Sequence, residues 1–313
     1  MPSTRRQVLQ IGGTTILSAL AGCATANPFG SKKSPSEYTL SVESIDVSPV
    51  EHALYEPDGG ALFGTPARNA LDDILPDGRH TTYGYKPLPS DAYVTHDGSY
   101  YQTKHVVTGR TKMERQLVRV DPVPKEQVPD DAVLIDTLER PSARVLKILH
   151  SYTQTDGEST AGLLREDAYV LRRPAERESR LATGDLDGRV VTMTESGTWA
   201  YRVHVTRKQI VETAYTALAI SVADSRSQFR EVVFGSRIDT ELAPAKLAGA
   251  ARELLNEAVA RETYTETAPI SDAFDTVLEA LGLGAVDTAA NGKLLWYDEE
   301  FYRYGLYINP PSS

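Results

Sequence analysis

The segment Asp97-Gly98-Ser99-Tyr100-Tyr101 joins a two-residue turn signal to the start of a strand rich in aromatic residues. Glycine after aspartate accepts the positive φ of a tight hairpin turn, and aromatic residues fit the pleated surface of a sheet. The same order returns at Ser196-Gly197 before Thr198-Trp199-Ala200-Tyr201, and at Asn291-Gly292 before Leu294-Leu295-Trp296-Tyr297. Each copy therefore predicts antiparallel β-structure.

A further strand-like run follows each copy, at 115–120, 215–222 and 301–308. We expect a short turn before each run, so that each unit forms an antiparallel meander. In the last run Tyr302, Tyr304, Leu306 and Ile308 share one face of the strand, because side chains alternate between the two faces.

Proline opens a helical pattern upstream of each meander. The patterns cover 66–75, 141–149 and 244–260, and proline at a first helical position loses no hydrogen bond. A further helix is expected over 271–281, with Gly282 as its C-terminal stop.

These elements predict an α+β fold of repeated helix plus antiparallel β-meander modules, with the helices packed on one sheet face. Asp91-Ala92-Tyr93-Val94 returns as Asp167-Ala168-Tyr169-Val170, and more loosely as Ser271-Asp272-Ala273-Phe274. Either a duplication of the module or common turn chemistry in unrelated elements accounts for this repeated segment. The expected units are a signal at 1–22, a tether at 23–37 and modules at 38–122, 130–236 and 240–313, with linkers at 122–129 and 236–244.

The first 23 residues carry an export signal. Arg5 and Arg6 precede an apolar run, which is the pattern read by the twin-arginine translocation machinery. That run, 8–21, is interrupted by Gly, Thr and Ser and is too short to span a bilayer. It ends in a lipobox pattern, Leu20-Ala21-Gly22-Cys23, whose small residues admit a peptidase and whose thiol accepts a lipid. The alternative is a basic tail before a short core helix with a buried cysteine.

The segment after Cys23 is expected to be a flexible tether, because 24–37 is rich in Pro, Gly and Ser and poor in large apolar residues. Cleavage before Cys23 would leave a lipid-anchored protein on the outer side of the cell membrane. Stable anchoring needs two hydrocarbon chains on that cysteine, since a single chain binds a bilayer only marginally.

The charge balance of 43 acidic against 33 basic residues gives a net charge of -10, which argues against binding to nucleic acid. The single cysteine excludes an intramolecular disulfide, a cysteine-based zinc site and an iron–sulfur cluster.

The signal, the preference for Arg over Lys and the Asp97-Gly98-Ser99-Tyr100-Tyr101 pattern resemble haloarchaeal twin-arginine-exported surface lipoproteins, which carry no assigned activity. The end 302–307 is similar to these proteins too. The resemblance implies a cell-surface location, a fold of such modules and a diether lipid on Cys23. No catalytic residue comes with it.

Sequence motifs for catalysis or metal binding are few. The sequence has no G-x-S-x-G, S-x-x-K or H-E-x-x-H motif and no glycine-rich phosphate loop. His80, His96 and His105 are either metal ligands or surface strand residues, and the second interpretation is favoured because their spacing matches no ligand pattern. Asp185-Leu186-Asp187-Gly188 begins like a calcium loop but lacks the later acids, so it predicts a turn. Neither a metal nor a cofactor is therefore expected.

A carboxylate pair and the aromatic residues remain as candidates for a site. Glu299 and Glu300 point to opposite faces if they lie on a strand, and their expected place is the turn before Phe301. The aromatic side chains suggest a candidate binding surface, although aromatic strand residues more often pack in a core. The residues of that candidate surface are Tyr100, Tyr101, Trp199, Tyr201, Trp296, Tyr302 and Tyr304.

The sequence thus predicts a membrane-anchored extracytoplasmic lipoprotein that acts without catalysis, as a binding or envelope protein. Its expected partners are the membrane, through the lipid on Cys23, and an envelope protein or ligand that the sequence does not identify. The alternative is an extracytoplasmic hydrolase with an unrecognised acid–base site. A solute receptor is disfavoured, because the short antiparallel elements do not build two large α/β lobes.

Overall fold

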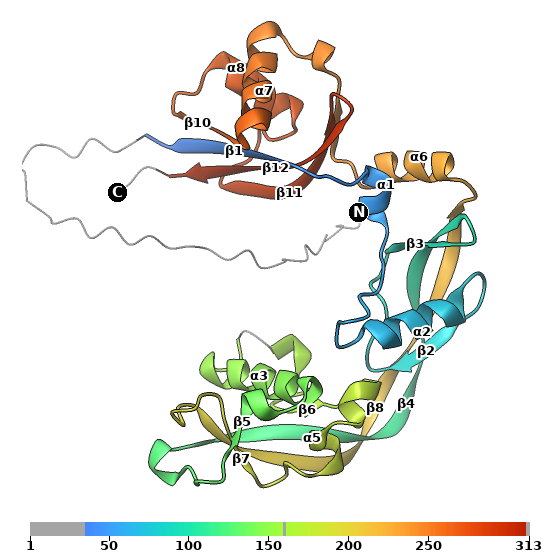
Figure 1. Cartoon of the computed structure of the whole chain (residues 1–313), viewed down its shortest axis with the longest axis vertical. Coiled ribbons are helices and arrows are strands. Elements are labelled where there is room, and N and C mark those ends of the chain that lie inside the picture. The colour runs from blue at the N-terminus through green and yellow to red at the C-terminus, as the bar shows by residue number, and fades with distance from the viewer. Residues whose placement is uncertain (1–34, 159–160, 311–313) are drawn as a thin grey trace, which may run out of the picture.

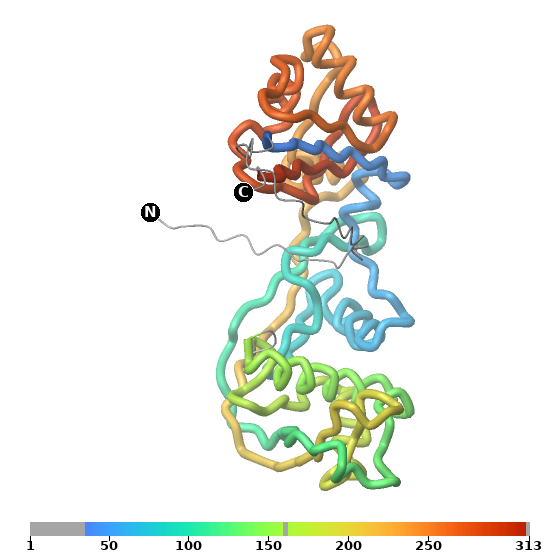
Figure 2. The backbone as a smooth tube through the Cα atoms, turned by 90° about the vertical axis from the view of Figure 1, so that its left-hand side faces the viewer, coloured from blue at the N-terminus to red at the C-terminus, as the bar shows by residue number. Residues whose placement is uncertain are grey.

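The computed structural model describes residues 35–158 and 161–310. The predicted signal and lipidation residues, Arg5, Arg6 and Leu20-Ala21-Gly22-Cys23, lie outside this part of the chain. The described residues form an elongated α+β molecule with an upper lobe, a middle part and a lower lobe along a two-stranded ribbon (Figure 1). Figure 2 shows the three parts stacked one above another. None of the described helices combines the length and the apolar character needed to cross a membrane.

The ribbon consists of two long antiparallel strands, β4 (Ser99–Val123) and β8 (Ala200–Ala223), paired from Tyr100 opposite Ala223 to Val123 opposite Ala200. The expectation of a short turn inside each of these segments is wrong. The middle of β4, at 106–112, is exposed. In the middle of β8 every second residue is buried from Ile210 to Thr216, but the buried positions mix apolar and polar side chains, so no hydrophobic alternation marks a long strand there. A bulge between Val107 and Gly109 shifts the register without ending the strand.

The upper lobe is a five-stranded mixed sheet with α7 (Gly249–Arg261) and α8 (Asp272–Ala280) on one face, as the predicted fold class requires. Leu40, Leu255, Phe274 and Tyr304 lie in the shared core. The strand order is β10 (Thr263–Thr267), β1 (Glu37–Ser44), β12 (Glu300–Asn309), β11 (Ala289–Tyr297) and β9 (Thr240–Leu242).

The hairpin of β11 and β12 turns at Asp298 and Glu299, which have φ values of 51° and 62°. Asn291-Gly292, expected to be a turn, instead lies inside β11 at a shift of the register. Gly292 has φ 69°, so it supplies the positive φ of a bulge rather than of a hairpin turn. The helix expected over 244–260 is split into a 3₁₀ turn, Pro244–Lys246, and α7.

The middle part packs short elements on the upper half of the ribbon. The predicted hairpin at Asp97-Gly98 is confirmed, since φ values of 48° and 80° join β3 (Tyr93–His96) to β4. The remaining elements are α1 (Pro49–Ala53), α2 (Gly64–Ile74), β2 (His80–Tyr83) and α6 (Arg226–Ser236).

The lower lobe surrounds a second core that contains Leu146, Leu149, Leu181 and Val203. The turn predicted at Asp185-Leu186-Asp187-Gly188 is confirmed, and Asp187 Oδ1 accepts the backbone N–H of Val205 at 2.8 Å. The elements of this lobe are 3₁₀ turns Lys125–Gln127, Ile135–Thr137 and Ala161–Leu163, strands β5 (Val133–Leu134), β6 (Tyr169–Val170) and β7 (Val190–Thr192), and helices α3 (Arg140–Gln154), α4 (Pro174–Arg177) and α5 (Arg180–Thr183).

The repeated-module detail of the predicted fold is not confirmed. Strands from the expected modules 38–122 and 130–236 pair along their whole length in the ribbon, and β1 joins the sheet of the third. The echoed segments 91–94 and 167–170 do share one feature, because β3 and β6 both pair with β4. The looser copy at 271–274 begins α8 instead.

Candidate functional site

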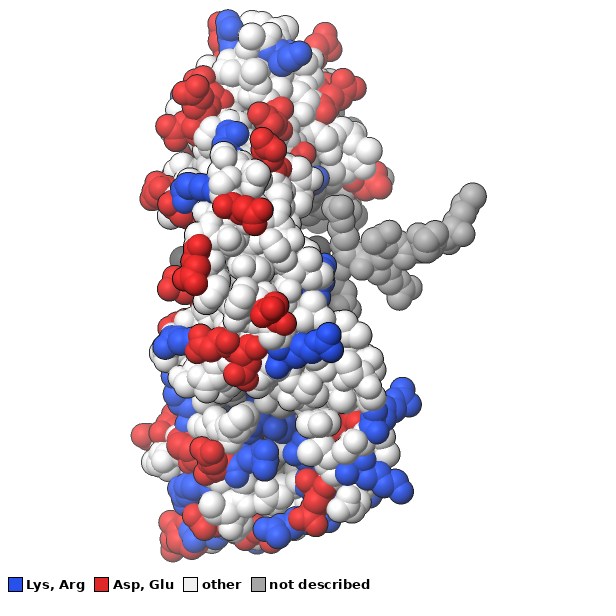
Figure 3. Space-filling view, turned by 90° about the vertical axis from the view of Figure 1, so that its right-hand side faces the viewer, with Lys and Arg blue, Asp and Glu red and all other residues white. Residues whose placement is uncertain are grey.

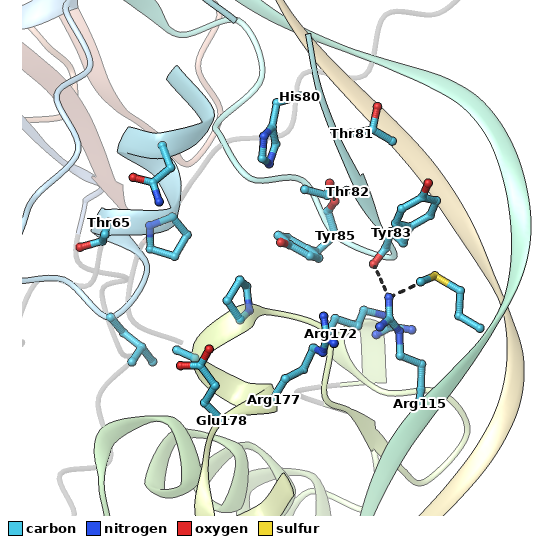
Figure 4. Close-up of a pocket in the computed structure, with 16 residues that line it drawn as sticks. Thr65, His80, Thr81, Thr82, Tyr83, Tyr85, Arg115, Arg172, Arg177 and Glu178 are labelled. Atoms are coloured by element: carbon cyan, nitrogen blue, oxygen red, sulfur yellow. Dashed lines mark hydrogen bonds between the residues drawn. The ribbon is translucent and has the colours of Figure 1, made fainter. Parts of the chain in front are cut away.

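A cavity of about 640 Å³ lies where the middle part meets the lower lobe, between α2 and β2 on one side and α4 on the other (Figure 4). Its size is in the range of small-molecule sites. The residues that line it are Leu62, Thr65, Pro66, Asn69, His80, Thr81, Thr82, Tyr83, Tyr85, Met113, Arg115, Arg172, Pro174, Ala175, Arg177 and Glu178.

The amphipathic pattern of α2 determines which of its residues reach the cavity. Ala67, Ala70 and Ile74 recur at helical spacing and are buried in the core on the ribbon. Pro66 and Asn69 fall outside that stripe and line the cavity instead.

The floor of the cavity contains a buried charged cluster of Arg115 on β4, Glu212 on β8 and Arg172 after β6. Arg172 Nε donates to Glu212 Oε1 at 2.9 Å, and Arg115 Nε lies 3.4 Å from the same oxygen. Glu212 is only 3% exposed and Arg115 only 7%. Two guanidinium groups therefore share one carboxylate, and the cluster keeps an excess positive charge.

Arg115 is incompletely satisfied for a buried cation. Its Nη2 donates at 3.4 Å to the carbonyl of Tyr83 and contacts Met113 Sδ at the same distance. Its buried Nε has no hydrogen-bond partner within the described residues, since the contact to Glu212 lacks hydrogen-bond geometry. Buried donors are usually paired, because an unpaired one forfeits its hydration.

Glu176 contrasts with this cluster, because its contacts are structural. Its carboxylate accepts the Tyr169 hydroxyl at 2.6 Å and the backbone N–H groups of Arg172 and Arg173 at 3.0 Å. Burial, and next the charge of Glu176, raises the pKa of Tyr169. Glu176 thus fixes the loop that presents Arg172 to the cavity.

Two further hollows, of about 550 and 370 Å³, adjoin the cavity and share lining residues with it. On a protein with net charge -10 the three together are unusually basic, since Glu176 and Glu178 are the only carboxylates among the described residues that line them. Figure 3 likewise shows Lys and Arg gathered mainly over the lower lobe on the face in view. The lysines and arginines that line the hollows are Lys86, Arg115, Arg140, Arg144, Lys147, Arg172, Arg173 and Arg177.

Cation–π contacts hold the two sides of this region together. The ring centroid of Phe63, just before α2, lies 4.0 Å from the guanidinium carbon of Arg173 and 5.2 Å from that of Arg144. Arg140 Nη1 donates to the carbonyl of Gly60 at 2.7 Å. Each cation–π contact contributes roughly 0.5 to 2 kcal/mol. Together with the hydrogen bond of Arg140, these contacts join the segment before α2 to the arginines of the lower lobe.

The three histidines considered as metal ligands have different partners. His80 Nδ1 lies 2.7 Å from Asp73 Oδ2, His96 Nε2 lies 3.4 Å from Asp97 Oδ2, and His105 Nδ1 lies 3.2 Å from Ser90 Oγ. Within 35–158 and 161–310 no group of three or more His, Cys, Asp or Glu side chains is arranged to hold a metal ion. Of the three, His80 alone lines the cavity.

The candidate aromatic surface does not form in the structure. Tyr100, Tyr201, Tyr302 and Tyr304 are buried, because their rings fill the cores under the sheets. Tyr100 stacks on Phe229 with ring centroids 4.2 Å apart, and the Tyr304 hydroxyl donates to the carbonyl of Leu281 at 2.8 Å. Tyr101 and Trp296 are partly buried on different parts of the molecule, and Trp199, 50% exposed, directly precedes β8 and lies beside His150 of α3.

No protein-family model matches the chain, and comparison with curated proteins and with solved structures gave no match. Arg115 and Glu212 were not predicted as site residues, because no local sequence motif surrounds them. Only the pairing of β4 with β8 brings them together. The run Arg172-Arg173 followed by Glu176 and Arg177 is a local concentration of charge that the sequence analysis did not use and that could have marked this place.

Proposed function

We propose that this protein is a lipid-anchored extracytoplasmic binding protein, held at the outer face of the cell membrane by a lipid on Cys23. The observation that supports binding is the cavity at Arg115, Arg172 and Tyr85, a hollow of ligand size in which polar and charged groups converge beside apolar walls. The Arg5-Arg6 signal and the lipobox at Leu20-Ala21-Gly22-Cys23 support the location.

The position of β1 in the upper lobe fits such an anchor (Figure 1). β1 starts at Glu37 in the upper lobe, and residues 24–36 would span at most about 45 Å when extended. The cavity lies away from the upper lobe, where the middle part meets the lower lobe. An anchored upper lobe would leave the cavity open to solutes and partners outside the cell.

Fractionation of cells tests the location. Replacing Arg5 and Arg6 by Lys should retain the precursor in the cytoplasm, and Cys23→Ala should release the protein into the medium. Arg252→Lys with Arg261→Lys, on the exposed face of α7, is the control and should leave the protein in the membrane fraction. Normal membrane fractionation of both the signal variant and Cys23→Ala would contradict the proposal.

A thermal-shift screen of the full-length protein in detergent tests the binding function. Ala175→Trp would fill the cavity from α4, and Ala248→Trp, at the exposed start of α7, is the matched control. A solute that raises Tm should lose its effect in Ala175→Trp and keep it in Ala248→Trp. Equal shifts in both variants would place binding elsewhere and would contradict this part of the proposal.

Extracytoplasmic hydrolysis is the second candidate function, and the His80–Asp73 contact of 2.7 Å favours it. A histidine oriented by a carboxylate beside a cavity has the arrangement of a general base. Turnover of a chromogenic ester that His80→Gln abolishes and His96→Gln preserves would support hydrolysis over binding alone.

A further inference from the structure

We infer that the cavity binds the carboxylate or phosphate group of a small anionic solute through Arg115, Arg172 and Arg177. This inference rests on the proposed binding function and names its ligand class. The charge of the cavity floor, the donors left free there and the apolar walls around them all suit such a ligand.

The charges on the floor do not cancel. Glu212 is the carboxylate shared by Arg115 and Arg172, and no ion pair of Arg177 is found in the described part of the chain. Glu178 lines the rim as the opposing charge. A bound oxyanion would neutralise the remaining positive charge, and burial strengthens that attraction relative to water.

The free donors suit an oxyanion. Arg172 donates to Glu212 through Nε, so its two Nη groups remain available for other partners. Within residues 35–158 and 161–310 no hydrogen bond of Arg172 involves either Nη group. Figure 4 shows the side chains of Arg172 and Arg177 reaching toward each other from the α4 side, with Arg115 alongside. Planar guanidinium groups bind carboxylate and phosphate oxygens with paired hydrogen bonds.

The walls above these arginines favour a ligand that has an apolar body. Leu62, Pro66, Met113 and Pro174 line the cavity, and the ring of Tyr85 faces the arginines. A volume of about 640 Å³ admits a small organic molecule. Phenyl phosphate and benzoate combine such a body with either oxyanion, and benzamide is a neutral molecule of nearly the same shape as benzoate.

Isothermal titration of the full-length protein in non-ionic detergent tests the inference. At least one of phenyl phosphate and benzoate should bind about tenfold more tightly than benzamide, since hydrogen bonds to charged groups are the stronger ones. Arg177→Gln, which changes an exposed residue, should weaken the anion about tenfold. Arg172→Lys keeps the charge beside Glu212 but loses the fork, and it should also weaken the anion. Arg180→Gln, on the exposed side of α5, is the control and should leave the affinity unchanged.

The outcomes separate this inference from the proposed function. Equal binding of benzamide and both anions, with no effect of Arg177→Gln, would overturn the anion specificity and leave a binding cavity intact. Failure of both anions to bind at millimolar concentration would also overturn it. The binding part of the proposed function fails on a different result, namely equal Tm shifts in Ala175→Trp and Ala248→Trp. An affinity lost in Arg177→Gln and kept in Arg180→Gln, with unchanged circular dichroism, supports the assignment.

Discussion

A Cβ atom on Gly84 would lie only 2.3 Å from Oε2 of Glu212, so the backbone after β2 packs directly on the buried carboxylate. The same Cβ would lie 2.4 Å from Arg172 Nε. Gly84 has φ 78°, and its N–H donates to the carbonyl of Thr213 at 2.9 Å. Glycine at this position therefore permits both the turn and the ion pair beneath it.

Gly84→Ala should destabilise the protein by about 3 kcal/mol, because the positive φ and the displaced ion pair both add to the cost. Gly98→Ala is a matched control, since Gly98 has φ 80° but no atom of the described residues within 4 Å of the place its new methyl group would take. It should cost only about 1 kcal/mol. Urea denaturation measures both free energies of unfolding, and equal losses would show that the contact with Glu212 is unimportant.

Glu212→Gln should lower the free energy of unfolding by roughly 3 to 5 kcal/mol, because it leaves two guanidinium groups without their buried counter-charge. The control is Asp167→Asn, which removes a more exposed pair with Arg119, 2.8 Å long, and should cost less than about 1 kcal/mol. Urea denaturation at fixed ionic strength compares them. A loss in Glu212→Gln no larger than that in the control would mean that the cluster contributes little.

Leu40→Ala tests the completion of the upper lobe by β1. Leu40 is fully buried between the sheet and the helices, so its truncation should cost about 3 kcal/mol. Thr39→Ala, at the neighbouring partly exposed position, should cost less than about 1 kcal/mol. Hydrogen exchange of the β12 amides should accelerate in the first variant only, and unchanged exchange there would contradict the pairing of β1 with β12.

Alkaline pH should destabilise the upper lobe through Tyr264. The hydrogen bond to Glu266, 2.8 Å long, is the main cause that raises the pKa of Tyr264 to about 12. An unfolded tyrosine ionises near pH 10. Since the folded pKa is the higher one, this stabilisation is complete below pH 10 and is lost as the pH rises toward 12.

Tyr264→Phe should therefore flatten the fall of Tm between pH 10 and 12, whereas Tyr307→Phe, at an exposed site, should not. Burial also raises the pKa of Tyr169 and Tyr304, so part of the fall remains in any single variant. Absorbance at alkaline pH should show one fewer late-ionising tyrosine in Tyr264→Phe. The same Tm profile in the wild type and in Tyr264→Phe would contradict the role of this hydrogen bond.

Local signals predicted part of this fold. The Asp97-Gly98 turn and the helix at 271–281 follow from short-range rules about positive φ, capping and apolar periodicity, and both are found. The long strands β4 and β8 are different, because the middle of β4 is exposed and the buried positions in the middle of β8 include Glu212 and Thr216, so their sequences show no hydrophobic alternation. Asn291-Gly292 shows that a turn dipeptide also satisfies a bulge inside a strand.

The cavity could not be predicted in the same way. Arg115, Arg172 and Glu212 belong to three distant segments, and only the pairing of β4 with β8 and the placement of β6 bring them together. Tyr302 and Tyr304 show the opposite case, because the favoured interpretation of aromatic strand residues as core residues is correct for them.

Lipid anchoring at Cys23 is tested most directly by the intact mass of the protein taken from its native membrane. We predict a chain that begins at Cys23 and carries two hydrocarbon chains attached through a lipid on that cysteine. A chain that begins at Met1 with a free thiol at Cys23 would contradict this prediction.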